Sequence, residues 1–146
     1  MKVLFTAVLL SGLCLSGLAQ ASQVPNEVLN TFQLLRSYTN RYEATGKSLN
    51  GGTCTLNIDY DPSAVVVTLV GDTTAFKDTA SYLTVIKNVD SFSNEKVTFG
   101  DSGWDGEETR FTLARTATEL TVSAQYTYSE YYGGGSTADT CIFKKK

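Results

Sequence analysis

The chain has 146 residues, 42% of them hydrophobic, with a formal net charge of −3 and no histidine. Without histidine there is no Ser-His-Asp or Cys-His triad, no imidazole general base and no common zinc ligand. The mild acidity argues against nucleic acid or an anionic membrane as the partner, because both attract a basic surface.

The N-terminus predicts a secretory signal peptide over residues 1–21. Lys2 supplies the positive start, Val3 to Leu15 form an apolar stretch, and Ala19-Gln20-Ala21 offers the small residues that a signal peptidase needs. A membrane anchor is the alternative, but this stretch is short for a span of about 20 residues. We therefore expect a secreted or periplasmic protein that is free of the membrane after cleavage.

Cleavage after Ala21 changes the formal charge from −3 to −4, because it removes Lys2 and no acidic residue. Acylation at Cys14 would instead make the chain a lipoprotein, but Leu13 stands where a small residue is preferred. Residues 22–146 have the length of a single domain.

That domain begins with a short amphipathic helix, predicted over residues 26–36. The apolar positions that follow helical spacing are Val28, Phe32 and Leu35. From Ser37 to Leu49, Tyr and other residues alternate with Thr and charged residues, and this favours a strand over a continued helix.

The rest of the chain has the alternating pattern of half-buried strands. Together with residues 37–49, about eight strands are predicted. The further strand segments are 54–60, 64–70, 81–89, 96–100, 110–115, 120–128 and the stretch around Cys141 and Phe143. Their short polar connections favour antiparallel neighbours in a meander.

Cys54 and Cys141 remain after signal removal and are predicted to form one disulfide. A disulfide needs Cα atoms roughly 4.4 to 6.8 Å apart. In a closed meander the first and last strands are neighbours, whereas in an open one they are far apart. The pair therefore favours an all-β meander closed as a small barrel, with a β-sandwich as the alternative.

This succession of short antiparallel strands resembles the calycin class of small barrels, which includes the lipocalins. The resemblance concerns architecture only. The Gly-x-Trp motif of lipocalins is missing from the first strand, where the sequence has Asn40-Arg41-Tyr42. No lipocalin ligand residues are carried over to this chain.

The Gly- and acid-rich loop from Asp101 to Glu108 is the local sequence pattern most similar to a metal-binding loop. Its weak candidates for metal ligands are Asp101, Asp105 and Glu107. A calcium loop, however, has an oxygen ligand where Gly103 stands and a bidentate acid where Thr112 stands. We therefore expect a hairpin tip that binds neither metal nor cofactor.

Aromatic residues near two loops are candidates for binding. They are Trp104 in the acidic loop and Tyr128, Tyr131 and Tyr132 in a stretch rich in Tyr, Ser and Gly, a composition typical of binding loops. The alternatives are that Trp104 folds over the barrel end as a lid on the core, and that the tyrosine stretch is a strand ending in a flexible hairpin.

These features predict an exported, non-enzymatic binding or interaction protein, a monomer that meets an unknown protein or small ligand through its loops or outer face. The alternative is a carrier of a small apolar ligand inside the barrel. A filled interior is favoured by the bulky inward residues Leu56, Ile58, Leu83, Leu120 and Val122. A third interpretation is a hydrolase that uses two carboxylates. Its candidates are Asp59, Asp61, Asp101, Asp105, Glu107 and Glu108.

Overall fold

The computed structural model describes residues 24–71, 81–86, 89–103, 106–128, 131 and 133–146. The predicted signal peptide lies outside these residues. The described elements are α1 (Asn26–Thr39), β1 (Thr45–Ser48), β2 (Thr53–Tyr60), β3 (Val65–Gly71), β4 (Ser81–Ile86), β5 (Ser91–Phe92), β6 (Lys96–Ser102), β7 (Glu108–Arg115), β8 (Glu119–Tyr128) and β9 (Gly135–Lys144).

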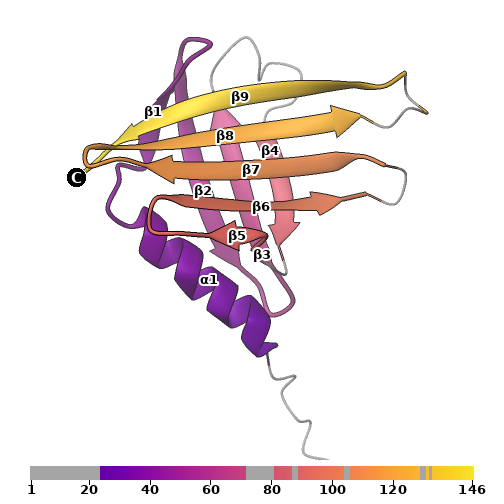
Figure 1. The fold of residues 1–146 in the computed structure, drawn as a ribbon, viewed down its shortest axis with the longest axis horizontal. Helices are drawn as coiled ribbons and strands as arrows, with labels where there is room; N and C mark the ends of the chain where they lie inside the picture. Colours follow the sequence, from indigo (N-terminus) through magenta and orange to yellow (C-terminus); the bar gives the residue numbers. More distant parts are fainter. Residues whose placement is uncertain (1–23, 72–80, 87–88, 104–105, 129–130, 132) are drawn as a thin grey trace, which may run out of the picture.

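The described strands form one antiparallel sheet in the order β4-β3-β2-β1-β9-β8-β7-β6-β5. The first strand of the chain therefore lies beside the last, and the edges of the sheet are β4 and β5 (Figure 1). The sheet curls so far that β4 lies over β6 and β7. This curled half-barrel confirms the all-β class, while full closure as a calycin-like barrel stays a prediction.

The sheet bends sharply at β1. Gly46 of β1 pairs with Cys54 of β2, and Ser48 of β1 pairs with Cys141 of β9. Two strands on either side of a third lie about 9 to 10 Å apart in a flat sheet. The Cα atoms of Cys54 and Cys141 are only 6.4 Å apart, and their sulfur atoms lie at disulfide distance. The predicted pairing of these cysteines is therefore confirmed.

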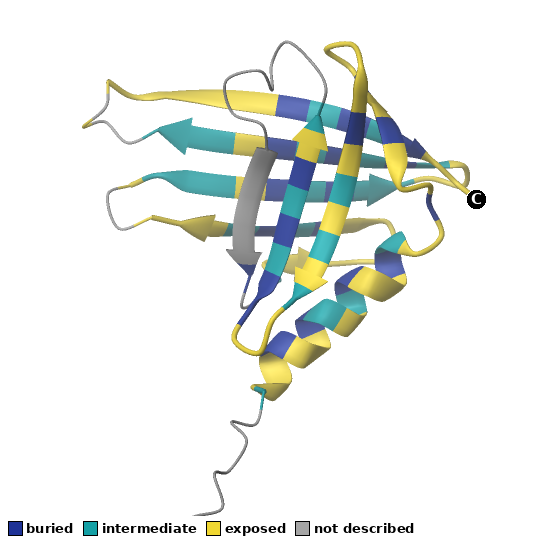
Figure 2. Ribbon diagram, turned by 180° about the vertical axis from the view of Figure 1, so that it is seen from behind, coloured by how far each residue is buried: buried dark blue, intermediate teal, exposed yellow. Residues whose placement is uncertain are grey.

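Helix α1 covers the open side of the half-barrel and contacts β2 and β3 (Figure 2). The ring of Phe32 packs 5.0 Å from that of Tyr60 in β2. The ring of Tyr38 lies 5.7 Å from that of Phe92 in β5. One helix thus bridges both halves of the curled sheet.

The helix ends at Thr39 rather than at residue 36. Tyr38 lies one turn beyond Leu35, so it extends the buried stripe of the helix, and only 2% of it is exposed. Its hydroxyl donates a 3.3 Å hydrogen bond to the carbonyl of Leu113. The predicted strand over residues 37–49 is therefore wrong in its first part, because tertiary burial of Tyr38 outweighs the β preference of tyrosine.

Side chains fill the centre of the half-barrel. The largest fully buried ones are Phe99, Phe111, Phe143, Leu35, Leu69, Ile86, Leu113, Leu120, Val65, Val67 and Val97. Val122 is also buried, as predicted, whereas Leu56 and Ile58 are only half-buried, and the side chain of Leu83 lies outside the described part. The two half-buried residues mark the place where the core is incomplete.

Candidate functional site

Two hollows flank the connection between α1 and β1, and both include Glu43 in their lining. The inner pocket is lined by Thr39, Asn40, Tyr42, Glu43, Ala44, Leu56, Ile58, Leu120, Phe143 and Lys146. The outer groove is lined by Glu43, Thr45, Gly46, Lys47, Thr53, Glu119, Ile142 and Lys144. The connection and the strand ends beside it therefore form the candidate site.

The inner pocket exists because β1 is short. Its pairing with β2 ends at the Thr45–Thr55 pair, and its pairing with β9 covers only Lys47 and Ser48. Before Thr45 in the chain, no described strand lies between β2 and β9. A hollow of about 150 Å³ remains in this gap.

The chain from Asn40 to Ala44 crosses the gap and is anchored to β9. Tyr42 forms an isolated β-bridge with Lys145, and the backbone N–H of Glu43 donates a 2.8 Å hydrogen bond to the carbonyl of Lys144. The backbone N–H of Lys146 donates a 2.9 Å hydrogen bond to the carbonyl of Arg41. The connection therefore has a defined path and gives the pocket a fixed wall.

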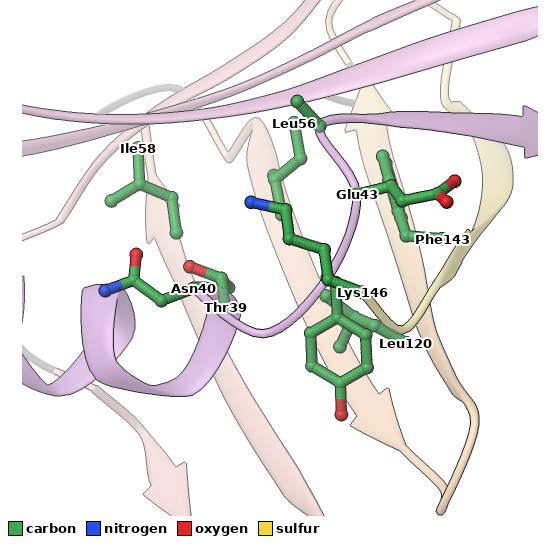
Figure 3. Close-up of a pocket in the computed structure, with 10 residues that line it drawn as sticks. Thr39, Asn40, Glu43, Leu56, Ile58, Leu120, Phe143 and Lys146 are labelled. Atoms are coloured by element: carbon green, nitrogen blue, oxygen red, sulfur yellow. The ribbon is translucent and has the colours of Figure 1, made fainter.

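The floor of the inner pocket is apolar and its mouth is polar. Leu56, Ile58, Leu120 and Phe143 supply the floor from three different strands (Figure 3). Such a floor beneath a few polar groups is typical of small-molecule sites. A cavity of about 150 Å³ accepts one molecule the size of benzene.

The mouth carries charges of both signs. Lys146 lies on one side of it and Glu43 on the other, and their charged ends point in opposite directions (Figure 3). The C-terminal end of α1 opens at Thr39 and Asn40, and a helix C-terminus carries partial negative charge. Lys146 offsets that negative end, so the mouth favours neither an anion nor a cation strongly.

The outer groove has a volume of about 470 Å³, within the usual range of ligand sites. Its floor includes half-buried Ile142, and its rim carries Lys47, Glu43 and the ion pair between the Lys144 ammonium and the Glu119 carboxylate. The methylene stems of such long side chains add apolar surface to a groove while their charges remain in water.

The acidic loop lies elsewhere, at the far end of β6 and β7. Asp101 is exposed and Glu107 is half-buried, and the Glu107 carbonyl accepts a 2.6 Å hydrogen bond from the N–H of Gly103. Asp105 and Trp104 lie outside the described residues. Within the described ranges, no group of three or more Cys, Asp and Glu side chains is arranged to hold a metal ion.

The predicted tyrosines are also separate from the two hollows. Tyr128 is half-buried, with its ring 4.8 Å from the ring of Tyr126. Tyr131 is 88% exposed, and Tyr132 lies outside the described residues. None of the described candidates lines the inner pocket or the outer groove.

Asp61, a candidate for carboxylate chemistry, is engaged in the turn between β2 and β3. Its Oδ1 accepts hydrogen bonds from the N–H of Ser63 at 2.6 Å, the hydroxyl of Ser63 at 2.7 Å and the N–H of Ala64 at 2.9 Å. The Ser63 hydrogen bonds, aided by that of Ala64, lower the pKa of the Asp61 carboxyl. Asp59 is exposed, and its Oδ1 accepts a hydrogen bond from the N–H of Tyr60. The contacts of Asp61 are those of a turn-stabilising acid.

The polar mouth of the inner pocket is not predictable from the local sequence pattern. Thr39, Asn40, Glu43 and Lys146 gather there because β1 begins late and the chain must cross to β9. The alternation in 54–60 did identify Leu56 and Ile58 as inward residues. It could not show that no strand would cover them.

Among the described residues, no helix is both long and apolar enough to cross a membrane. Comparison with known proteins finds no match: no protein-family model, no curated protein and no solved structure is significantly similar to this chain.

Proposed function

We propose that this chain is an exported, non-enzymatic binding protein whose inner pocket holds a small, largely apolar, neutral molecule. The Cys54–Cys141 pair and the signal-like N-terminus support export to an oxidising compartment. Residues 22–146 supply no histidine for acid–base or nucleophilic chemistry.

The apolar floor of the inner pocket is the observation that carries this proposal. Leu56 and Ile58 remain half-buried although they face the core side of β2. An apolar guest would bury their exposed surface at roughly 25 cal/mol per Å². The mixed charges at the mouth make a neutral guest with one hydrogen-bonding group the best match.

Benzyl alcohol is a suitable probe, because its ring has the size that such a volume accepts. Methyl NMR spectra should show saturable shifts at Leu56, Ile58 and Leu120. Replacing Ala44 by Leu narrows the pocket at its rim and should weaken binding about tenfold or more, as overfilling a packed site does. Ala117→Leu, an exposed change outside the lining, is the matched control and should bind as the wild type does.

Shifts spread evenly over the surface, or equal binding by the Ala44→Leu variant, would show that the inner pocket is not the site. Saturation transfer to the floor methyl groups would separate true pocket binding from weak surface association.

The outer groove supports a second candidate, recognition of a partner through the outer face. Its volume falls in the range of ligand sites, and its charges of both signs can fix the orientation of a polar partner. Phenylalaninamide and acetyl-phenylalanine can serve as probes of opposite charge. Shifts confined to Thr53 and Ile142, lost on Ile142→Asp, would favour this candidate over the inner pocket.

A further inference from the structure

Among the described residues, β1 covers only part of the outer edge of strand β9. Its whole length pairs with β8, but β1 reaches only Cys141 and Ile142 on the other side. A further contact, from the N–H of Leu49 to the carbonyl of Thr140, extends the covered part by one residue. Among the described residues, no strand pairs with the outer edge of residues 135–138, which lie along the border of the sheet layer (Figure 1).

The direction of the backbone groups on this edge follows from the Leu49 contact. The carbonyl of Thr140 points toward β1, and residues two apart in a strand point their N–H and C=O groups to the same side. Ser136 and Ala138 therefore direct their N–H and C=O groups away from β8. No backbone hydrogen bond within the described part of the chain uses these four groups.

The side chains of residues 135–138 offer little of the usual protection against pairing. Native edge strands are guarded by Lys, Pro, bulges or inward charges. Residues 135–138 are Gly, Ser, Thr and Ala, all exposed and all uncharged. Nothing in these side chains opposes the approach of another strand.

The edge is complementary to itself. In an antiparallel pair centred on Thr137, Ser136 of one copy faces Ala138 of the other, and the two exchange both backbone hydrogen bonds. The two-fold axis repeats this pair, so four hydrogen bonds form. The threonines meet at the axis as a cross-strand pair, and no like charges face each other.

We propose that two copies of this protein pair through the edges of β9 at residues 135–138 and join their sheets into one continuous antiparallel sheet. So short an edge buries less than the roughly 1,200 Å² of a standard stable interface. The dimer is therefore reversible and forms at high protein concentration. The proposed dimer does not depend on the inner pocket. If it forms, the protein is a monomer only in dilute solution.

Sedimentation equilibrium over a wide range of concentrations tests the pairing. S136K/A138K places lysines opposite each other twice and should weaken the dimer roughly tenfold. S136E/A138K places opposite charges in the same positions and should restore or strengthen it. The difference between the variants should shrink at high salt, where exposed charges are screened.

A cysteine at the two-fold axis gives a second readout. Facing residues of this kind have Cα atoms about 4.5 Å apart, within the range that a disulfide can bridge. Thr137→Cys should therefore yield a covalent dimer under oxidised glutathione. Thr118→Cys, an exposed change in the turn after β7, should stay monomeric under the same conditions.

Three results would overturn the proposal: wild-type protein that stays monomeric at every concentration, charge variants that associate equally, or Thr137→Cys that cross-links no better than Thr118→Cys. Unchanged thermal melting of each variant confirms that the comparison is made between folded proteins.

Discussion

The hydroxyl of Ser48 donates a 3.0 Å hydrogen bond to Oδ1 of Asp139, which joins the end of β1 to the middle of β9. Both residues are buried, with 8% and 2% exposed. The same Oδ1 accepts a 2.7 Å hydrogen bond from the N–H of Thr140, and Oδ2 has no hydrogen-bond partner among the residues that the structure describes. The carboxyl group is therefore incompletely satisfied and depends on Ser48.

Ser48→Ala should destabilise the protein by about 1–3 kcal/mol, because it removes a partner from a buried carboxyl group. Ser136→Ala, an exposed change, should stay within about 0.5 kcal/mol of the wild type. The double variant S48A/D139V should be less destabilised than the two single changes added together, since the buried group that lacked partners is gone. Urea unfolding of the wild type, the two single variants, the double variant and the Ser136→Ala control measures these differences, and additive effects would contradict the coupling.

The Cys54–Cys141 pair should be oxidised in exported protein. Its sequence separation of 87 residues closes a long loop, and replacing both cysteines by Ala should cost about 2–4 kcal/mol. Mass spectrometry of a non-reduced digest should recover the linked peptides. Two free thiols in the native exported protein would be the contrary result.

Gly46→Ala should destabilise the corner of the sheet at β1. A Cβ there would lie 2.7 Å from the carbonyl oxygen of Ile142 and 2.9 Å from the ring of Phe143. Relief requires movement of the β9 backbone, so a loss of about 1–3 kcal/mol is expected, as in overpacked cores. Thr45→Ala on the outer face is the control. Equal thermal stability of the two variants would show that the β9 backbone moves to accommodate the added methyl group at little cost.

Tyr38 should make stability depend on pH in the alkaline range. Burial raises the pKa of its hydroxyl above the ordinary 10.0, although the Arg115 guanidinium, 4.7 Å from the ring centre, opposes the shift. The folded state therefore holds this proton more tightly than the unfolded state, so its contribution is complete below pH 10.0 and is lost as the pH rises through the folded-state pKa.

Tyr38→Phe should remove the part of the alkaline loss of stability that comes from this hydroxyl. At neutral pH it should lower the free energy of unfolding by about 0.5–1.5 kcal/mol, because the hydrogen bond to Leu113 is missing. Unfolding free energies measured at neutral pH and above pH 10.0 test both effects. Tyr131→Phe, at a highly exposed site, should follow the wild-type pH dependence. Parallel curves for wild type and Tyr38→Phe would refute the argument.

Tyr131 should be dispensable for folding. It is 88% exposed, so Tyr131→Ser should change stability by no more than about 0.5 kcal/mol. Tyr128→Ser should cost more, because its half-buried ring packs against Tyr126, and such an aromatic pair adds about 0.5–1.5 kcal/mol. A large loss at Tyr131 in urea melts would count against recognition through this loop.

Most strands could be predicted because each exposes one face to water. In β8, the buried residues Leu120, Val122 and Ala124 alternate with more exposed neighbours, and a period of two is visible in any such stretch. The disulfide could be predicted from cysteine number and compartment alone. The helix over residues 26–36 was also visible in its apolar spacing, although its true end was not.

The sequence by itself thus determined the antiparallel β class, the inward face of most strands and the Cys54–Cys141 pair, since these depend on local periodicity and residue type. Only the tertiary structure decided where β1 stops, and this created the inner pocket and left residues 135–138 of β9 without a described strand on their outer side. It also placed Tyr38 in a helix, because contact with Leu113, far along the chain, outweighs local preference. Such features depend on which segments far apart in the chain come into contact, and a local sequence pattern carries no information about those contacts.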